Sequence, residues 1–212
     1  MPLSPHNQHF ETGQFDGFIT HGLCQIQKSF DTFLSSHTFL PVRGDFFALL
    51  EDPRRIDGDG VRKLAPGDPQ PVDTSHLSFT PDADGRNTLG VDGAILECQQ
   101  VTINVGETLW FHWAFTRFDW SPANDFAVFA AYEGDHVDTQ PIFKNVLTQT
   151  IALERQNRWY TDWQAFSWRP VTKFSGTLRW IVSNGISTSH ALPRPGGSAR
   201  PSALLIDCVE LT

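Results

Sequence analysis

Short apolar runs rich in Val, Ile, Thr, Phe and Trp recur along this chain between Gly, Pro, Asn and Asp, and a helical period is almost absent. Apolar runs bounded by turn-forming residues are typical of β-strands. We expect nine strands, at about residues 21–29, 45–50, 94–104, 107–118, 125–133, 140–151, 163–169, 175–183 and 202–211. This pattern predicts an all-β chain.

One of these runs differs from the others. From Leu109 to Phe115 the residues are apolar almost without interruption, whereas a strand with one face in water alternates apolar and polar residues. Such a strand is either covered on both faces or carries an exposed aromatic side chain that binds something. We expect it to lie at the centre of a sheet.

Two antiparallel sheets packed face to face, about 10 Å apart, bury one face of every strand. That arrangement accounts for the 17 Phe and 7 Trp of the chain. We therefore predict an antiparallel jelly-roll β-sandwich of about eight to ten strands with long edge loops. A single domain would cover residues 1–212, with residues 1–9 as a flexible N-terminus.

The stretch from 51 to 93 is interrupted by Gly, Pro and Asp and is predicted to be a long loop excursion. Loops of this length are usually functional or mobile, so we expect it to wall or cover a pocket at one end of the sandwich. Its acidic segments 57–60 and 82–85 lack the closing Glu of the twelve-residue EF-hand loop, so turns explain them better. A second excursion is expected at 185–201.

Composition narrows the possible partners. A hydrophobic fraction of 40% and an aromatic fraction of 12% exclude a disordered chain. The net charge of -8 offers no positive counter-surface to phosphates, so no nucleic-acid partner is expected. No apolar run approaches the roughly 18 residues of a membrane helix. The first 30 residues also lack the apolar stretch of a signal peptide.

The chain has three cysteines, Cys24, Cys98 and Cys208, without the spacing of a zinc site or of a disulfide framework. The simplest interpretation is that all three are small buried residues. A disulfide between Cys24 and Cys208 is the alternative, if the first and last strands pair.

The segment from Arg117 to Asp125 holds the densest mixture of aromatic, acidic and amide side chains. A sugar site needs an aromatic surface for the apolar face of the ring, flanked by polar groups that bind hydroxyls. Arg117, Asp119, Trp120 and Asn124 are of these types. The alternative is structural, with Asn124 capping a turn and Trp120 in the core.

A second mixed cluster precedes another expected strand. It consists of Arg158, Trp159, Tyr160, Asp162 and Trp163. Trp159 and Tyr160 are further candidates for ligand binding, and the same structural alternative applies to them. The binding interpretation gains support if both clusters lie at one edge of the sandwich.

Catalytic signatures are hard to find, since the chain has no GxSxG elbow, HExxH, P-loop or Rossmann glycine pattern. Glu107 and His112 lie at odd spacing on one expected strand, hence on opposite faces, which argues against their acting together. His112 is better explained as a satisfied strand histidine than as a base. A carboxylate pair for glycoside hydrolysis stays open because such pairs come from distant strands, and Asp119 and Glu133 are the first to consider.

Six short segments, taken in order, carry a resemblance to a known kind of protein. They are 9–13 (HFETG), 44–50 (GDFFALL), 124–129 (NDFAVF), 163–168 (WQAFSW), 175–180 (SGTLRW) and 202–207 (SALLID). Together they resemble the jelly-roll modules of exported bacterial proteins, including PEP-CTERM-type surface proteins and adhesins. Those modules are similar to galactose-binding-like and carbohydrate-binding modules. The resemblance runs from about Phe10 to Leu211 and implies a scaffold more firmly than a ligand.

The resemblance implies an extracellular or cell-surface protein whose lectin-like module binds a carbohydrate or similar polar ligand without catalysis. One alternative is a structural or interaction module of an adhesin or toxin system, which would show a large flat apolar surface. The other is a jelly-roll enzyme acting on a polysaccharide or small metabolite. That enzyme would need a deep pocket with two titratable groups.

In jelly rolls of this kind a structural calcium ion often joins the first strand to the last. The resemblance places Glu11 and Asp207 at the matching positions. Calcium takes about six to eight oxygen ligands, so Asp45, backbone carbonyls near Gly44 and water would complete the site. The alternative is that these acids accept hydrogen bonds from turns and strand ends.

Overall fold

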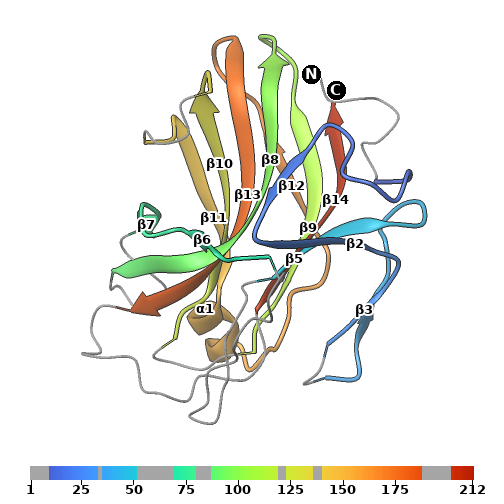
Figure 1. The fold of residues 1–212 in the computed structure, drawn as a ribbon, viewed down its shortest axis with the longest axis vertical. Coiled ribbons are helices and arrows are strands. Elements are labelled where there is room, and N and C mark those ends of the chain that lie inside the picture. Colours follow the sequence, from blue (N-terminus) through green and yellow to red (C-terminus); the bar gives the residue numbers. More distant parts are fainter. Residues whose placement is uncertain are drawn as a thin grey trace.

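The apolar runs of the sequence form two β-sheets that pack face to face, as Figure 1 shows. The computed structural model describes residues 10–32, 35–51, 69–79, 87–118, 123–135, 140–187 and 202–212. Neighbouring strands within the two sheets run antiparallel. The protein is therefore an all-β, antiparallel jelly-roll sandwich, and the fold class predicted from the sequence is confirmed.

The larger sheet has seven strands in the described part of the chain. Its order is β1-β8-β13-β10-β11, and β6 and β7 also pair with β8. The strands are β1 (Ile19–His21), β6 (Val72–Asp73), β7 (Ser78–Phe79), β8 (Thr88–Ile103), β10 (Phe126–Glu133), β11 (Phe143–Gln149) and β13 (Phe174–Ser187).

The smaller sheet has five strands in the order β12-β9-β14-β5-β2. They are β2 (Leu23–Gln27), β5 (Phe47–Glu51), β9 (Leu109–Thr116), β12 (Gln164–Trp168) and β14 (Ala203–Leu211). A small hairpin of β3 (Phe30–Asp31) and β4 (Thr38–Phe39) and one helix, α1 (Thr150–Arg155), complete the described elements. The expectation that the run 109–115 forms an internal strand is confirmed, because β9 lies between β12 and β14.

Each of the nine expected strands corresponds to one of these elements, but two are longer than expected. The strand β8 begins at Thr88, inside the expected excursion, and β13 continues to Ser187. The reason is that some glycines lie within strands at close backbone contacts. A Cβ at Gly93 would lie 2.0 Å from the Val182 oxygen, and one at Gly185 would lie 2.1 Å from the Asn124 oxygen. These glycines therefore let backbones approach and do not end the strands.

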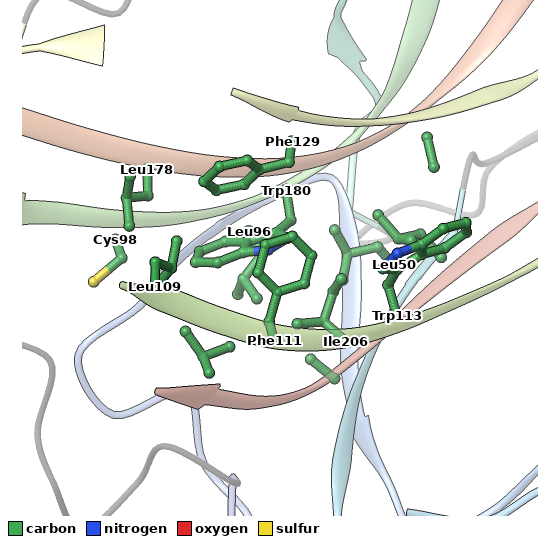
Figure 2. Close-up of a cluster of buried hydrophobic side chains, with 14 of the residues drawn as sticks. Leu50, Leu96, Cys98, Leu109, Phe111, Trp113, Phe129, Leu178, Trp180 and Ile206 are labelled. Carbon is green, nitrogen blue, oxygen red and sulfur yellow. The ribbon is translucent and has the colours of Figure 1, made fainter. Parts of the chain in front are cut away.

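Aromatic side chains fill the space between the sheets. Phe111 of β9 lies 5.1 Å from Phe129 of β10 and 5.5 Å from Trp180 of β13, measured between ring centroids. Figure 2 shows these three rings among Leu96, Leu109, Leu178 and Ile206. Such pairs add roughly 0.5–1.5 kcal/mol beyond the burial of their area. This shared core holds the two sheets together.

All three cysteines carry free thiols. The strand β5 lies between β2 and β14 in the smaller sheet, so Cys24 and Cys208 are not on neighbouring strands. The condition for the alternative disulfide is therefore not met. Burial raises the pKa of the Cys24, Cys98 and Cys208 thiols from 9.0 to about 12.

We expect the folded protein to lose stability as the pH rises from 9.0 towards about 12. Unfolded thiols ionise near the lower value, whereas buried thiols stay protonated, so ionisation favours the unfolded chain across this window. Urea unfolding at about pH 8 and about pH 10.5 measures the loss. Cys98→Ala should reduce the difference between the two pH values, and an unchanged difference would contradict the assignment to thiols.

In the part of the chain that the structure describes, no helix is long and apolar enough to cross a membrane. The helix α1 has six residues, and a span needs about 20.

Candidate functional site

The first predicted cluster is only partly described, because Asp119 and Trp120 lie outside the described residues. Asn124 is fully buried, and its amide nitrogen donates to Thr88 Oγ1 at 2.7 Å and to Gln149 Oε1 at 2.9 Å. Its side-chain oxygen accepts from the backbone N–H of Ile151 at 3.0 Å. The amide thus joins β8, β11 and α1. For Asn124 this geometry favours the structural alternative over ligand binding.

Arg117 of the first predicted cluster meets the second predicted cluster at one edge of the smaller sheet. The backbone N–H of Arg117 donates to the Trp159 oxygen at 2.9 Å, and Tyr160 forms a bridge with Thr116. The Arg117 guanidinium lies over the Trp159 ring, 4.2 Å from its centroid, and Nε donates to the Arg158 oxygen at 2.8 Å. Residues 41 to 44 positions apart in the sequence, 116–117 and 158–160, therefore form one group.

Within this group Arg117 is buried, whereas Arg158, Trp159 and Tyr160 are partly exposed. Arg117 is 3% exposed, and burial lowers the pKa of its guanidinium while nearby Glu154 raises it. Tyr160 stacks on His37 with ring centroids 4.3 Å apart and meets Phe39 edge to face at 5.7 Å. These rings cover one end of the outer face of the smaller sheet, meaning the face turned away from the larger sheet. Arg117 and Tyr160 therefore have clear structural partners.

The other end of this outer face is open. Along β9, Leu109, Phe111 and Trp113 point into the core, so Trp110 and His112 point outward. Trp110 is 43% exposed although its strand is internal. The apolar run 109–115 therefore does carry an exposed aromatic side chain, which was one of the two interpretations of its sequence.

Strand pairing decides which groups surround Trp110. Its neighbours in register are Ser167 of β12 on one side and Glu210 of β14 on the other. His112 has Ala165 and Asp207 as its neighbours in the same way. Side chains of directly opposite residues lie on the same face, with Cβ atoms about 4.5–5.5 Å apart. An indole is thus flanked by a hydroxyl and a carboxylate.

A one-residue bulge in β14 sets this arrangement. The pairing shifts between Asp207 and Glu210, and Cys208 has a φ of +53°. Three steps on β14 therefore correspond to two on β9, from His112 to Trp110.

Residues 40–45 border this open area, and we call this segment the wall. The Trp163 indole nitrogen donates to the Leu40 oxygen at 2.9 Å. Farther along, Asp207 Oδ2 accepts from the backbone N–H of Val42 at 2.7 Å and of Arg43 at 3.2 Å. The Arg43 side chain reaches Glu210, with Nη1 to Oε1 at 3.3 Å. The wall therefore places a guanidinium beside Glu210, which is the register neighbour of Trp110.

We call this area the Trp110 platform. It consists of Trp110, Ala165, Ser167 and Glu210 on the sheet, with Arg43 from the wall. Sequence reasoning did not select Trp110, Arg43 or Glu210. The apolar run hinted at Trp110, but Arg43 and Glu210 are 167 positions apart and only strand pairing brings them together.

The three residues proposed as calcium ligands lie near this wall. Both oxygens of the exposed Glu11 carboxylate accept from the backbone N–H of Asp45 at 3.0 Å. The buried Asp207 accepts from Val42 and Arg43, and its Oδ1 accepts from the Cys208 N–H at 2.7 Å. Carboxylates from near both ends of the chain thus accept hydrogen bonds from the backbone of the segment 42–45.

The recorded contacts of Glu11 and Asp207 are to backbone N–H donors, which would compete with a calcium ion for the carboxylate oxygens. Among the described residues, no three His, Cys, Asp or Glu side chains gather as a metal site. The hydrogen-bonded alternative accounts for the recorded contacts. Calcium binding stays a prediction, which melting temperatures after EDTA treatment and calcium addition can test. A rise on adding calcium supports it, and no response to either supports the alternative.

The residues considered for catalysis do not form a group in the described structure. Glu107 lies in the turn before β9, where Oε2 accepts from the Asn104 N–H at 2.7 Å. Glu133 ends β10 in the opposite sheet. Its suggested partner Asp119 is outside the described residues, so the pair cannot be assembled from this geometry.

No protein-family model and no curated protein sequence matches this chain. Similar solved structures include the carbohydrate-binding module TmCBM61 in complex with beta-1,4-galactotriose, at 14% identity and a TM-score of 0.42, covering 97% of this chain and 94% of that one. Another is the K1 cleaved adhesin domain of Lys-gingipain from Porphyromonas gingivalis. It has 12% identity and a TM-score of 0.42, and the match covers 96% of this chain and 95% of that one. The enzymatically active domain of tailspike protein 4 of bacteriophage CBA120 has 7% identity and a TM-score of 0.42. The match covers 97% of this chain and 20% of that one. Likenesses this remote carry no argument about the ligand, so function must be inferred from the site itself.

Proposed function

We propose that this protein is a non-catalytic module that binds carbohydrate on the Trp110 platform. The observation that carries the proposal is Trp110 itself, an indole 43% exposed on an internal strand. An internal strand has no need of an exposed Trp for folding, because its inward residues already reach the core. The exposed ring is therefore available to a ligand.

The chemistry around the indole suits a sugar. A pyranose presents an apolar ring face, which an aromatic surface can cover, and hydroxyls at its edge. Ser167, Glu210 and Arg43 supply hydroxyl, carboxylate and guanidinium groups beside that surface. The platform stands on paired strands and a hydrogen-bonded wall. Little conformational entropy should therefore be lost on binding.

We expect Trp110→Ala to weaken sugar binding by about 1 to 3 kcal/mol, as for other exposed aromatic anchors. A glycan array of the purified protein, with and without calcium, identifies a binding sugar, and calorimetry of that sugar measures the loss. Ile142→Ala is the matched control, since Ile142 is 58% exposed beside the larger sheet. If Trp110→Ala folds normally and binds the sugar with unchanged affinity, the Trp110 platform is not the binding site.

An extracellular or cell-surface location, and membership of the exported adhesin-associated or PEP-CTERM type, are part of this proposal. They rest on the sequence segments that resemble such modules. Fractionation of the source cells, followed by detection with an antibody, tests the location independently of ligand binding.

A second candidate function is protein interaction, favoured by apolar side chains on the wall. Leu40 is 61% exposed and Val42 is 40% exposed. Exposed apolar groups that gather on one surface often mark an interface. Concentration-dependent sedimentation that Leu40→Ser abolishes, together with a glycan array without hits, would favour this function.

A further inference from the structure

We infer that Arg43 and Glu210 form a polar clamp that makes the Trp110 platform selective for neutral glycans. The inference rests on the proposed function and adds the ligand class and the residues that select it. Arg43 Nη1 and Glu210 Oε1 are 3.3 Å apart. Together the pair offers an N–H donor and a carboxylate acceptor at one place.

The clamp lies beside the indole. Glu210 is the cross-strand neighbour of Trp110, so their Cβ atoms are about 4.5–5.5 Å apart on the same face. A sugar ring that stacks on the indole therefore brings its edge over the pair. One hydroxyl can donate to the Glu210 carboxylate while its neighbour on the ring accepts from Arg43. Adjacent hydroxyls are close enough to bridge two groups separated by 3.3 Å.

Both clamp residues are accessible, and their backbone is held in place. The Arg43 side chain is 69% exposed and that of Glu210 is 30% exposed. The Arg43 backbone is fixed because Asp207 accepts its N–H and that of Val42, while Glu11 accepts the N–H of Asp45. Only the guanidinium end must be ordered when a ligand binds.

Charge argues for a neutral ligand. The Arg43 charge is already matched by Glu210, and the buried carboxylate of Asp207 lies behind the same turn. A sugar acid would meet two carboxylates and one engaged guanidinium, on a protein of net charge -8. A neutral vicinal diol leaves the ion pair intact.

Native gel electrophoresis through soluble polysaccharides tests the clamp. The neutral probes are galactan, xylan and mannan, and the acidic probes are polygalacturonate and alginate. We expect at least one neutral probe to retard the protein and neither acidic probe to do so. Glu210→Gln and Arg43→Met should each weaken that retardation about 10-fold or more, because hydrogen bonds to charged groups are strong.

Asp73→Asn is the matched control, since it makes the same carboxylate-to-amide change on an exposed strand of the larger sheet. Melting temperatures verify folding, and an ion pair this exposed contributes little to stability.

The outcomes separate the inference from the proposed function. If Trp110→Ala abolishes retardation while Glu210→Gln and Arg43→Met behave as the unmodified protein, the clamp is overturned and sugar binding stands. Retardation by an acidic probe also overturns the neutral selectivity. If no probe and no array glycan binds the folded protein, the proposed function fails and the clamp fails with it.

Discussion

Arg179→Met should lower the free energy of unfolding by about 3 to 5 kcal/mol, since it breaks a buried ion pair and leaves one charge behind. Arg179 of β13 is 8% exposed and its register partner Glu97 of β8 is 2% exposed. Arg179 Nε donates to Glu97 Oε2 at 2.6 Å, and Gln99 Nε2 donates to Oε1 at 2.6 Å. Without Arg179, a carboxylate that is almost out of reach of water would keep the Gln99 amide and the His21 imidazole, whose Nε2 lies 3.8 Å from Glu97 Oε2, as its neighbours.

Urea unfolding of Arg179→Met, Glu97→Gln and the double variant measures this effect. The double variant should lose less than the sum of the two single variants, because it removes both charges together. Gln and Met keep most of the buried volume, so the comparison isolates charge from packing. A loss below about 1 kcal/mol for Arg179→Met would mean that water reaches the pair.

The second large effect is expected at the other sheet, where Asp207→Asn should cost about 2 to 4 kcal/mol of stability. Asp207 is fully buried and accepts from three backbone N–H groups, those of Val42, Arg43 and Cys208. An amide has one oxygen in place of two, and its NH₂ group would face an N–H donor. At least one buried donor should therefore lose its acceptor.

Urea unfolding measures this loss, and Asp73→Asn is again the matched control. Asp73 accepts a bond from the Ser75 N–H at 2.8 Å in an exposed turn, so its change should stay within about 0.5 kcal/mol. Asp207→Asn should also weaken sugar binding, because it frees the backbone that carries Arg43. Equal stability of the two variants would show that the wall is held by other contacts.

The strands were predictable because alternation and turn residues are local signals. The nine expected strands are found, including β9, whose unbroken apolar run correctly indicated an internal position. The helix α1 was not predicted, since it has six residues and its first turn depends on a bond from Ile151 to the distant Asn124. Short strands such as β6 and β7 were missed because they exist only by pairing with β8.

The site was harder to predict than the scaffold. Sequence reasoning placed Arg117 and Trp159 in two separate clusters, and it could show neither that the two side chains meet nor that Arg117 is buried. The exposure of Trp110 depends on which residues of β12 and β14 stand opposite it. That register is a property of strands far apart in the sequence, so residue type and local spacing do not contain it.

The bulge at Cys208 decides on which side of the sheet the last residues of β14 appear. In a regular strand, side chains alternate between the two faces of the sheet. If Asp207 faced outward in such a strand, Val209 would also face outward and Glu210 would face the core. The extra residue reverses both, so Val209 is buried in the core and Glu210 stands opposite Trp110. Deleting Cys208 would remove the extra residue together with the bulge, so Val209 should stay in the core and Glu210 should stay opposite Trp110. A one-residue insertion between Cys208 and Glu210, by contrast, would turn the carboxylate towards the core while the strand itself is retained.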